Sequence, residues 1–149
     1  MTSRYGLEIR AATATEAPGL ATLLAAAGYV TDARELADRL VALRQAPSAA
    51  LVAVHWGPPS GLVVLHWYLT LQAPRPIAQI TTLLVCVNER RRGIGRLLVK
   101  AAAQAARAAG CGELEVVTAA ETPSLHEFCR ATGFAEAGPR FVRSLRKQG

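Results

Sequence analysis

The sequence predicts an α/β fold, and three features of the chain favour this class. Strand-like and helix-like segments alternate in the order β-α-α-β-β-β-α-β-α-β, with no repeat or low-complexity segment among them. A central apolar run leads through a glycine-containing turn into a long helical segment. The 149 residues, 51% of them hydrophobic, suffice for one hydrophobic core, so residues 1–149 are expected to form a single domain.

The first part of the chain has the pattern of one strand followed by two helices. Apolar and polar residues alternate over 7–11, which predicts a short half-buried strand. The next helix is expected to begin at Thr15, as its N-cap, and to end at Gly28. Asp32 and Glu35 form a capping-box pattern, which predicts the start of a second helix.

Three strand-like segments come next. The β-type runs at 49–56 and 61–71 are separated by Gly-Pro-Pro-Ser, which predicts a hairpin. The connection at 72–76 is too rich in proline for regular structure. It leads to the apolar run 83–87, which has no polar face and is therefore expected to be a central strand covered on both sides.

A long helix should follow this central strand and end at Gly110. Arg96, Lys100 and Gln104 fall on one side of it, as expected for a solvent-exposed face. The predicted inner face consists of Leu97, Leu98, Ala101, Ala105 and Ala108.

The turn between this strand and this helix has the composition of a phosphate-binding site. Gly93 and Gly95 allow a tight turn that directs several N–H groups to one point, at the positive end of the helix dipole. Four of the seven residues from 90 to 96 are arginine, whose guanidinium groups suit phosphate oxygens. A Rossmann fingerprint is excluded because Leu98 stands where it needs Gly or Ala, and a P-loop because no Gly-Lys-Ser/Thr follows.

The same turn resembles the acetyl-CoA signature R/Q-x-x-G-x-G/A of the GCN5-related N-acetyltransferase (GNAT) family, present at 90–95 as Arg-Arg-Arg-Gly-Ile-Gly. A second stretch, 126–134, is similar to that family's H-x-F-Y-x-x-x-G-F helix end and follows the strand-like run 114–118. The two stretches together cover about residues 78 to 146. The resemblance implies a strongly twisted mixed β-sheet flanked by helices, and transfer of an acetyl group from acetyl-CoA to an amine.

The last part of the chain should contain one helix and one strand. Thr122 is a plausible N-cap and Pro123 suits the first helical position. The expected inner face of this helix is Leu125, Phe128, Cys129 and Thr132. The run 141–145, among arginines, is expected to be the final strand.

The family resemblance also implies where the co-substrate binds. The pyrophosphate would lie on the backbone amides of 92–96, and the pantetheine arm beside 85–87. The backbone N–H of Val85 would stabilise the negative charge that develops on the carbonyl oxygen. The expected cofactor-binding residues are Val85, Cys86, Val87, Arg90, Arg91, Arg92, Gly93, Ile94, Gly95 and Arg96.

The catalytic groups depart from the family pattern. Cys129 stands where relatives carry an acidic tyrosine; its thiol could donate a proton, although its side chain is shorter. A covalent acyl-cysteine route through Cys129 is a second hypothesis, whereas a buried mid-helix cysteine is more often a small apolar residue. The usual strand carboxylate is replaced by Thr81 and Thr82, which leaves Glu115 and His66 as candidate bases.

Composition excludes several other classes. The three histidines are scattered, which predicts no metal site, and the three cysteines are odd in number without a C-x-x-C spacing, which indicates a reducing compartment. No apolar stretch reaches the length of a membrane span, and the first residues lack a signal core, so a cytoplasmic protein is expected. The net charge of +6 leaves nucleic-acid binding open, but no basic-aromatic stripe accompanies it.

Three functions therefore remain. The first is an acetyl-CoA-dependent N-acetyltransferase that acts directly on a primary amine of a small molecule or peptide, as a monomer or homodimer. The second is a catalytically weak acetyl-CoA-binding sensor or regulator, and the third is a nucleic-acid-binding module. Few acidic residues fall where the acceptor should dock, which argues against strongly polycationic acceptors.

Overall fold

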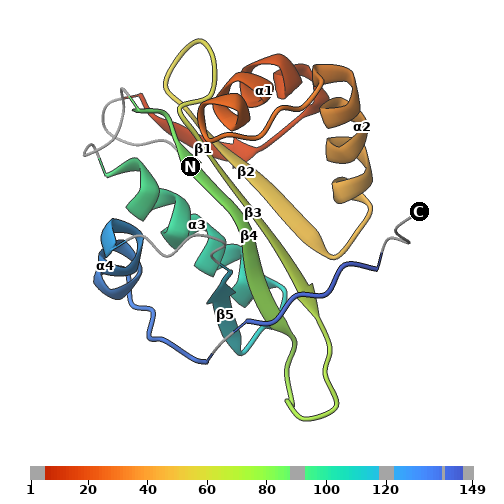
Figure 1. Cartoon of the computed structure of the whole chain (residues 1–149), viewed down its shortest axis with the longest axis vertical. Coiled ribbons are helices and arrows are strands. Elements are labelled where there is room, and N and C mark those ends of the chain that lie inside the picture. The colour runs from red at the N-terminus through yellow and green to blue at the C-terminus, as the bar shows by residue number, and fades with distance from the viewer. Residues whose placement is uncertain (1–5, 88–92, 118–122, 139, 146–149) are drawn as a thin grey trace.

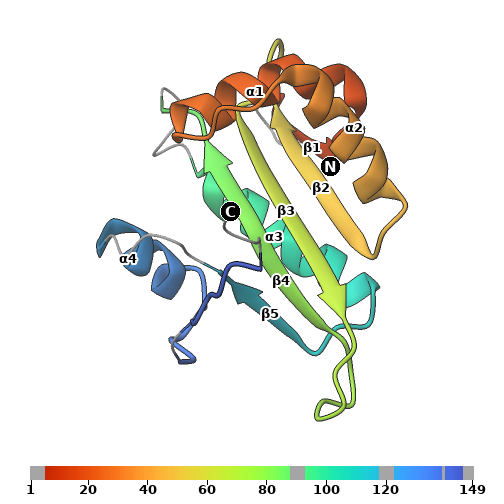
Figure 2. The ribbon, with the colours of Figure 1, turned by 45° about the vertical axis from the view of Figure 1, so that its right-hand side comes forward.

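The computed structural model describes residues 6–87, 93–117, 123–138 and 140–145, and within them it has one mixed sheet with helices on both faces (Figures 1 and 2). The strands run in the order β1-β2-β3-β4-β5; the first four are antiparallel to their neighbours, whereas β4 and β5 are parallel. The predicted fold class is confirmed. The strands are β1 Glu8–Ala11, β2 Ser48–Val54, β3 Gly61–Tyr68, β4 Ile77–Val85 and β5 Glu113–Val116. The helices are η1 Ala14–Glu16 (3-10), α1 Ala17–Ala26, α2 Ala33–Arg44, α3 Ile94–Ala108 and α4 Pro123–Ala131.

The sheet separates two hydrophobic clusters. Helices α1 and α2 cover one face, where Leu20 and Leu40 pack against Val52 of β2. Helix α3 covers the other face, where Leu98 packs with Leu65 of β3 and the core residues of β4. Alternation of side chains along each strand supplies both clusters from the same strands.

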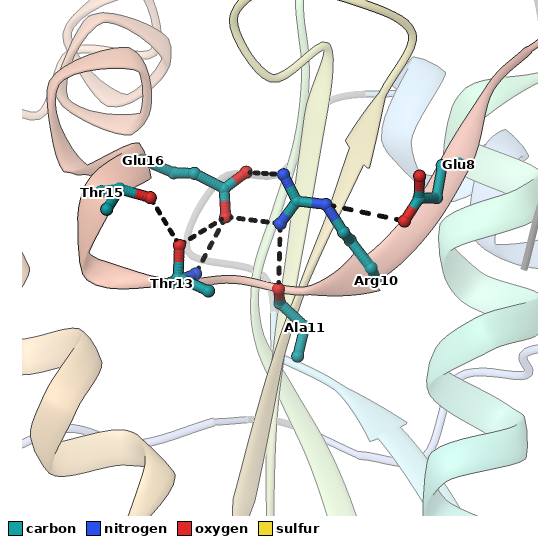
Figure 3. A network of polar contacts seen from close by, with 6 residues as sticks. All are labelled: Glu8, Arg10, Ala11, Thr13, Thr15 and Glu16. Carbon is teal, nitrogen blue, oxygen red and sulfur yellow. Dashed lines mark hydrogen bonds and ion pairs between the residues drawn. The ribbon is translucent and has the colours of Figure 1, made fainter.

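The junction between β1 and α1 is held by one glutamate (Figure 3). Both carboxylate oxygens of Glu16 accept hydrogen bonds of 2.9 Å from the Arg10 guanidinium, and one of them also accepts the backbone N–H of Thr13 at 2.8 Å. The bond to Glu16 raises the pKa of Arg10. The expected N-cap at Thr15 is wrong: Thr13 is the N-cap of η1, with its N–H bonded to the Glu16 carboxylate, and Glu16 is the N-cap of α1.

Helix α2 begins as expected. The carboxylate of Asp32 accepts the backbone N–H groups of Arg34 and Glu35, at 3.1 and 3.3 Å. Gly28 also ends the preceding helix as predicted, with a left-handed φ of 95°. Residue type in the sequence therefore identifies the end of α1 and the start of α2.

Strand β4 carries a bulge at Thr81. On the neighbouring strand Val64 pairs with Thr82 and Leu65 with Ile80, so Thr81 has no pairing partner of its own. The side chain of Ile80 faces the α3 cluster before the bulge, whereas Leu83 and Val85 face it afterwards. The extra residue thus changes which positions of β4 face each side of the sheet.

Helix α3 packs with a different line of residues from the predicted one. Its buried residues are Ile94, Leu98, Val99, Ala102 and Ala106. Leu97, Ala101 and Ala105 are only partly buried, and Ala108 is exposed. Gly61 explains the orientation, because a Cβ there would lie 2.9 Å from Leu98 Cδ1 and 3.2 Å from Ile94 Cγ2. The helix therefore rests directly on the β3 backbone.

The predicted final strand at 141–145 is wrong. Residues 140–145 have no regular secondary structure, and Phe141 and Leu145 are 89% and 91% exposed. The apolar residues there do not alternate strictly, since Phe141 and Val142 are adjacent, so the segment offers no single apolar face to the sheet. The strands also begin or end elsewhere than expected: β4 starts at Ile77 and ends at Val85, and β5 spans Glu113–Val116.

Candidate active site

The parallel strands β4 and β5 separate midway along β4. Their pairing runs from Ile77 with Glu113 to Ile80 with Val116, and the N–H of Val117 donates to the Ile80 carbonyl at 3.1 Å. Beyond Ile80, no strand of the described residues pairs with this edge of β4. We call this unpaired edge of 82–85 the β4 opening.

Two backbone amides of β4 face the opening. The N–H of Cys86 donates to the Ser60 carbonyl at 2.7 Å, so it points towards β3. Because amide direction alternates along a strand, the N–H groups of Val85 and Leu83 point the other way. The opening therefore presents hydrogen-bonding groups to an extended ligand.

The N-terminus of α3 follows soon after the end of β4 in the chain. Gly93 is its N-cap, with a left-handed φ of 78°, and its carbonyl accepts the first helical hydrogen bond from Leu97 at 3.0 Å. The N–H groups of Ile94, Gly95 and Arg96 precede that bond, as the free donors of a helix start do. They are the amides on which the sequence predicts that the pyrophosphate lies.

Helix α4 lies against this helix start. A Cβ at Gly95 would lie 3.2 Å from two ring atoms of Phe128 and 3.6 Å from Val85 Cγ2. The Arg96 guanidinium donates to the Ala131 carbonyl at 3.3 Å. Gly93 and Gly95 are thus required for different reasons: Gly93 for its backbone conformation, and Gly95 for close packing against the Phe128 ring.

Cys129 is half-buried on α4. Burial raises the pKa of its thiol, so the thiol is neutral at pH 7. Its backbone carbonyl accepts the N–H of Phe134 at 2.9 Å. Among the described residues, no hydrogen bond joins the Cys129 thiol to His126, the nearest candidate base on the same helix.

The expected cofactor-binding residues are only partly brought together. The end of the opening is surrounded by the start of α3 and the end of β4, that is, by Gly93, Ile94, Gly95, Arg96 and Val85. The Cys86 amide is directed away from it, and Val87 lies beyond the strand and is 59% exposed. Arg90, Arg91 and Arg92, and the predicted N-cap Thr122, lie outside the described residues. The sequence does not identify Leu83 as a site residue, because the bulge that turns its amide towards the opening leaves no pattern in the sequence.

A polar group of side chains lies near the opening on the sheet face opposite α3. His66 Nε2 is 3.1 Å from Thr81 Oγ1. The Tyr68 hydroxyl donates to Glu115 Oε1 at 3.4 Å, and Gln79 Nε2 reaches the same oxygen at 3.5 Å. Burial and the nearby Glu115 carboxylate raise the pKa of Tyr68. The candidate bases His66 and Glu115 thus both lie beside β4. His66 contacts Thr81, and Glu115 contacts Gln79.

Other kinds of site find little support in the described part of the chain. It holds no group of three or more His, Cys, Asp or Glu side chains suited to a metal ion. None of its helices is long and apolar enough to cross a membrane. Two shallow cavities, of about 200 and 210 Å³, lie between α2 and β2 and beside the β3–β4 loop, away from the β4 opening.

A mixed sheet whose parallel strands separate beside a free helix N-terminus offers backbone hydrogen bonds to an extended ligand and an anion site at one end. The chain belongs to the acetyltransferase (GNAT) family, whose sequence model matches residues 19–134. The family resemblance seen in the sequence is thereby confirmed, and acetyl-CoA is the co-substrate. No curated protein sequence matches the chain.

Solved structures share the fold over nearly the whole chain. An acetyltransferase of Trypanosoma brucei is 20% identical with a TM-score of 0.81, covering 93% of this chain and 99% of its own. An aminoglycoside acetyltransferase from an uncultured soil metagenomic sample, in complex with sisomicin, is 23% identical with a TM-score of 0.78. The match covers 95% of this chain and 97% of that protein's chain. An aminoglycoside N-acetyltransferase in complex with CoA is 19% identical with a TM-score of 0.81, covering 95% of each chain.

Proposed function

We propose that this protein is an N-acetyltransferase that transfers the acetyl group of acetyl-CoA directly to a primary amine of a small molecule or peptide. The observation that carries the proposal is the shared location of three features: the β4 opening, the free N–H groups of α3 and the Phe128 ring meet around Gly95 and Val85. Acetyl-CoA supplies an activated thioester carbonyl, and the chain holds and orients it.

Each backbone group has a distinct part in this proposal. The N–H groups of Ile94, Gly95 and Arg96 bind the pyrophosphate at the positive end of α3. The outward amides of Val85 and Leu83 bond the pantetheine arm and the carbonyl oxygen, on which negative charge develops during attack. Leu83 lies farther from the phosphate-binding turn, so its N–H is nearer the acyl end than that of Val85.

Acetyl-CoA should stabilise the folded protein, because it binds only the folded state. At a hundredfold excess over its dissociation constant the gain is about 2.7 kcal/mol, or roughly 5–10 °C in Tm for a domain of this size. ATP at the same concentration is the control for unspecific anion binding by a basic protein. Equal shifts with both ligands, or none with acetyl-CoA, would contradict the proposal.

Acetyl transfer itself is tested by CoA release across a panel of amines, including amino acids, peptides and aminoglycosides. The aminoglycosides are included because two proteins of similar fold act on them. Thiol release that depends on both the protein and the amine, with intersecting double-reciprocal plots, supports direct transfer.

Cys129→Ser should lose less than about tenfold in kcat/KM, under about 1.4 kcal/mol of transition-state stabilisation. The raised pKa keeps the thiol protonated, so it is a poor nucleophile and at most a proton donor near the leaving thiolate. Cys111→Ser is the matched control, because burial raises the pKa of that thiol too and it lies beyond the far end of α3.

A loss of several orders of magnitude in Cys129→Ser alone, in protein that still binds acetyl-CoA, would favour the acyl-cysteine route instead. That route also requires an acetyl adduct on Cys129 in the mass spectrum and ping-pong kinetics. We expect neither.

The second candidate function is an acetyl-CoA-binding sensor with weak catalysis. It is motivated by two departures from the family pattern: Cys129 stands at the usual tyrosine position, and Thr81 and Thr82 stand where a carboxylate is usual. Binding of acetyl-CoA without amine-dependent CoA release would favour this function over the enzyme.

A further inference from the structure

Glu115 occupies a defined place at the base of the β4 opening. It pairs in register with Gln79, one position before the last pair of the β4–β5 ladder, Ile80 with Val116. Since Val116 and Ile80 face the α3 cluster, the side chains of Glu115 and Gln79 point to the other face of the sheet. That face is not covered by a helix at this point, and Glu115 is exposed.

Two neighbouring strands position the Glu115 carboxylate. The Tyr68 hydroxyl of β3 and the Gln79 amide of β4 both donate to Oε1 over long distances, 3.4 and 3.5 Å, and Oε2 has no donor among the described residues. Both donors are neutral, so they orient the carboxylate without cancelling its charge.

The Glu115 carboxylate has no cationic partner among the residues that the structure describes. Glu8, Glu16, Glu35 and Glu136 each form an ion pair with an arginine. A free carboxylate held at a substrate opening, in a protein of net charge +6, favours a cationic group supplied from outside.

We propose that Glu115 binds a second positively charged group of the acceptor, so that the preferred acceptors are small diamines rather than monoamines or amino acids. This inference rests on the proposed N-acetyltransferase function. Gln79 is four residues from Leu83 along β4, a span of about 10–13 Å at the usual rise and allowing for the bulge. The inference requires the Glu115 side chain and a short alkyl diamine to bridge that span together and to leave the free amine at the opening. A single carboxylate pairs with one additional positive charge, so it favours an acceptor with two amino groups. This agrees with the scarcity of acidic residues, which argues against strongly polycationic acceptors.

The test compares 1,4-diaminobutane with 1-aminobutane, which has the same carbon chain and one amino group. We expect the wild type to favour the diamine at least about tenfold in kcat/KM, corresponding to one charge-assisted contact. Glu115→Gln should abolish most of this preference by raising the KM for the diamine, with little change in acetyl-CoA binding. A fall in kcat of similar size with both amines would instead assign Glu115 as the base and overturn the inference. Tyr68→Phe should reduce the preference less, because Tyr68 only positions the carboxylate.

Glu113→Gln is the matched control. Glu113 lies on the same strand and the same sheet face, about 6–7 Å from Glu115, and its mutation removes the same charge. If the preference came from the general negative field of β5, the two variants would behave alike, and the proposed contact would be wrong. An unchanged preference in Glu115→Gln, or a wild type without preference, would also overturn it.

Calorimetric titration of CoA-loaded protein with 1,4-diaminobutane separates this inference from the proposed function. Binding that is lost in Glu115→Gln and kept in Glu113→Gln would support the role of Glu115 even if no acetyl group were transferred. Acetyl transfer that is independent of Glu115 would support the enzyme and overturn the inference.

Discussion

Replacing Gly93 with valine is expected to raise the dissociation constant for acetyl-CoA about tenfold or more. Gly93 has a φ of 78°, which a β-branched residue adopts only at a cost of about 1–3 kcal/mol. The turn relieves that strain by changing its conformation, and the N–H groups of Ile94, Gly95 and Arg96 then no longer point to one place. Isothermal titration of the folded variant with acetyl-CoA measures the effect.

Gly110→Val is the control for this variant. Gly110 has a similar φ of 85° and lies at the opposite end of α3, and a Cβ added at either glycine would meet no atom within 4 Å. It should lose similar stability while keeping its affinity for acetyl-CoA. An unchanged dissociation constant in folded Gly93→Val would show that the pyrophosphate does not bind at the start of α3.

Leu98→Ala should lower the free energy of unfolding by about 2–5 kcal/mol, which corresponds to a fall of roughly 4–20 °C in Tm. Leu98 is fully buried between the sheet and α3, and its Cδ1 lies directly over Gly61. No side chain at Gly61 can move in to fill the space, so the cavity should persist. Chemical denaturation followed by circular dichroism measures the change.

Leu71→Ala is the matched substitution, since Leu71 is fully exposed at the β3–β4 loop. It should change the free energy of unfolding by less than about 0.5 kcal/mol. Similar losses in the two variants would contradict the packing of α3 on β3 described above.

The sequence predicts elements well where local periodicity and end signals agree. Asp32 begins α2 and Gly110 ends α3 as expected, because each acts through its own backbone or side chain. Elements whose limits depend on partners are less predictable. β4 ends at Val85 rather than 87, and the segment 141–145 is not a strand, because pairing partners rather than composition decide both.

The site divides in the same way. The glycines and the helix start could be predicted, since left-handed turns and free N–H groups follow from residue type and position. The orientation of Leu83 could not, because it depends on the bulge at Thr81, and a bulge is a property of two paired strands. The closeness of Tyr68, Gln79 and Glu115 likewise depends on three strands being adjacent.

The bulge at Thr81 determines where β4 tolerates a change in chain length. The residues on either side of it pair with consecutive residues of β3, Ile80 with Leu65 and Thr82 with Val64, so removing Thr81 would leave a regular ladder. Leu83 and Val85 would keep their β3 partners, their side chains would still face the α3 cluster, and their amides would still face the opening. An added residue after Leu83 would instead move every later side chain to the other face of the sheet. Insertions and deletions among relatives of this chain should therefore gather at position 81 and in the loop at 69–76, which has no strand pairing to disturb, and insertions should be absent between Leu83 and Val85.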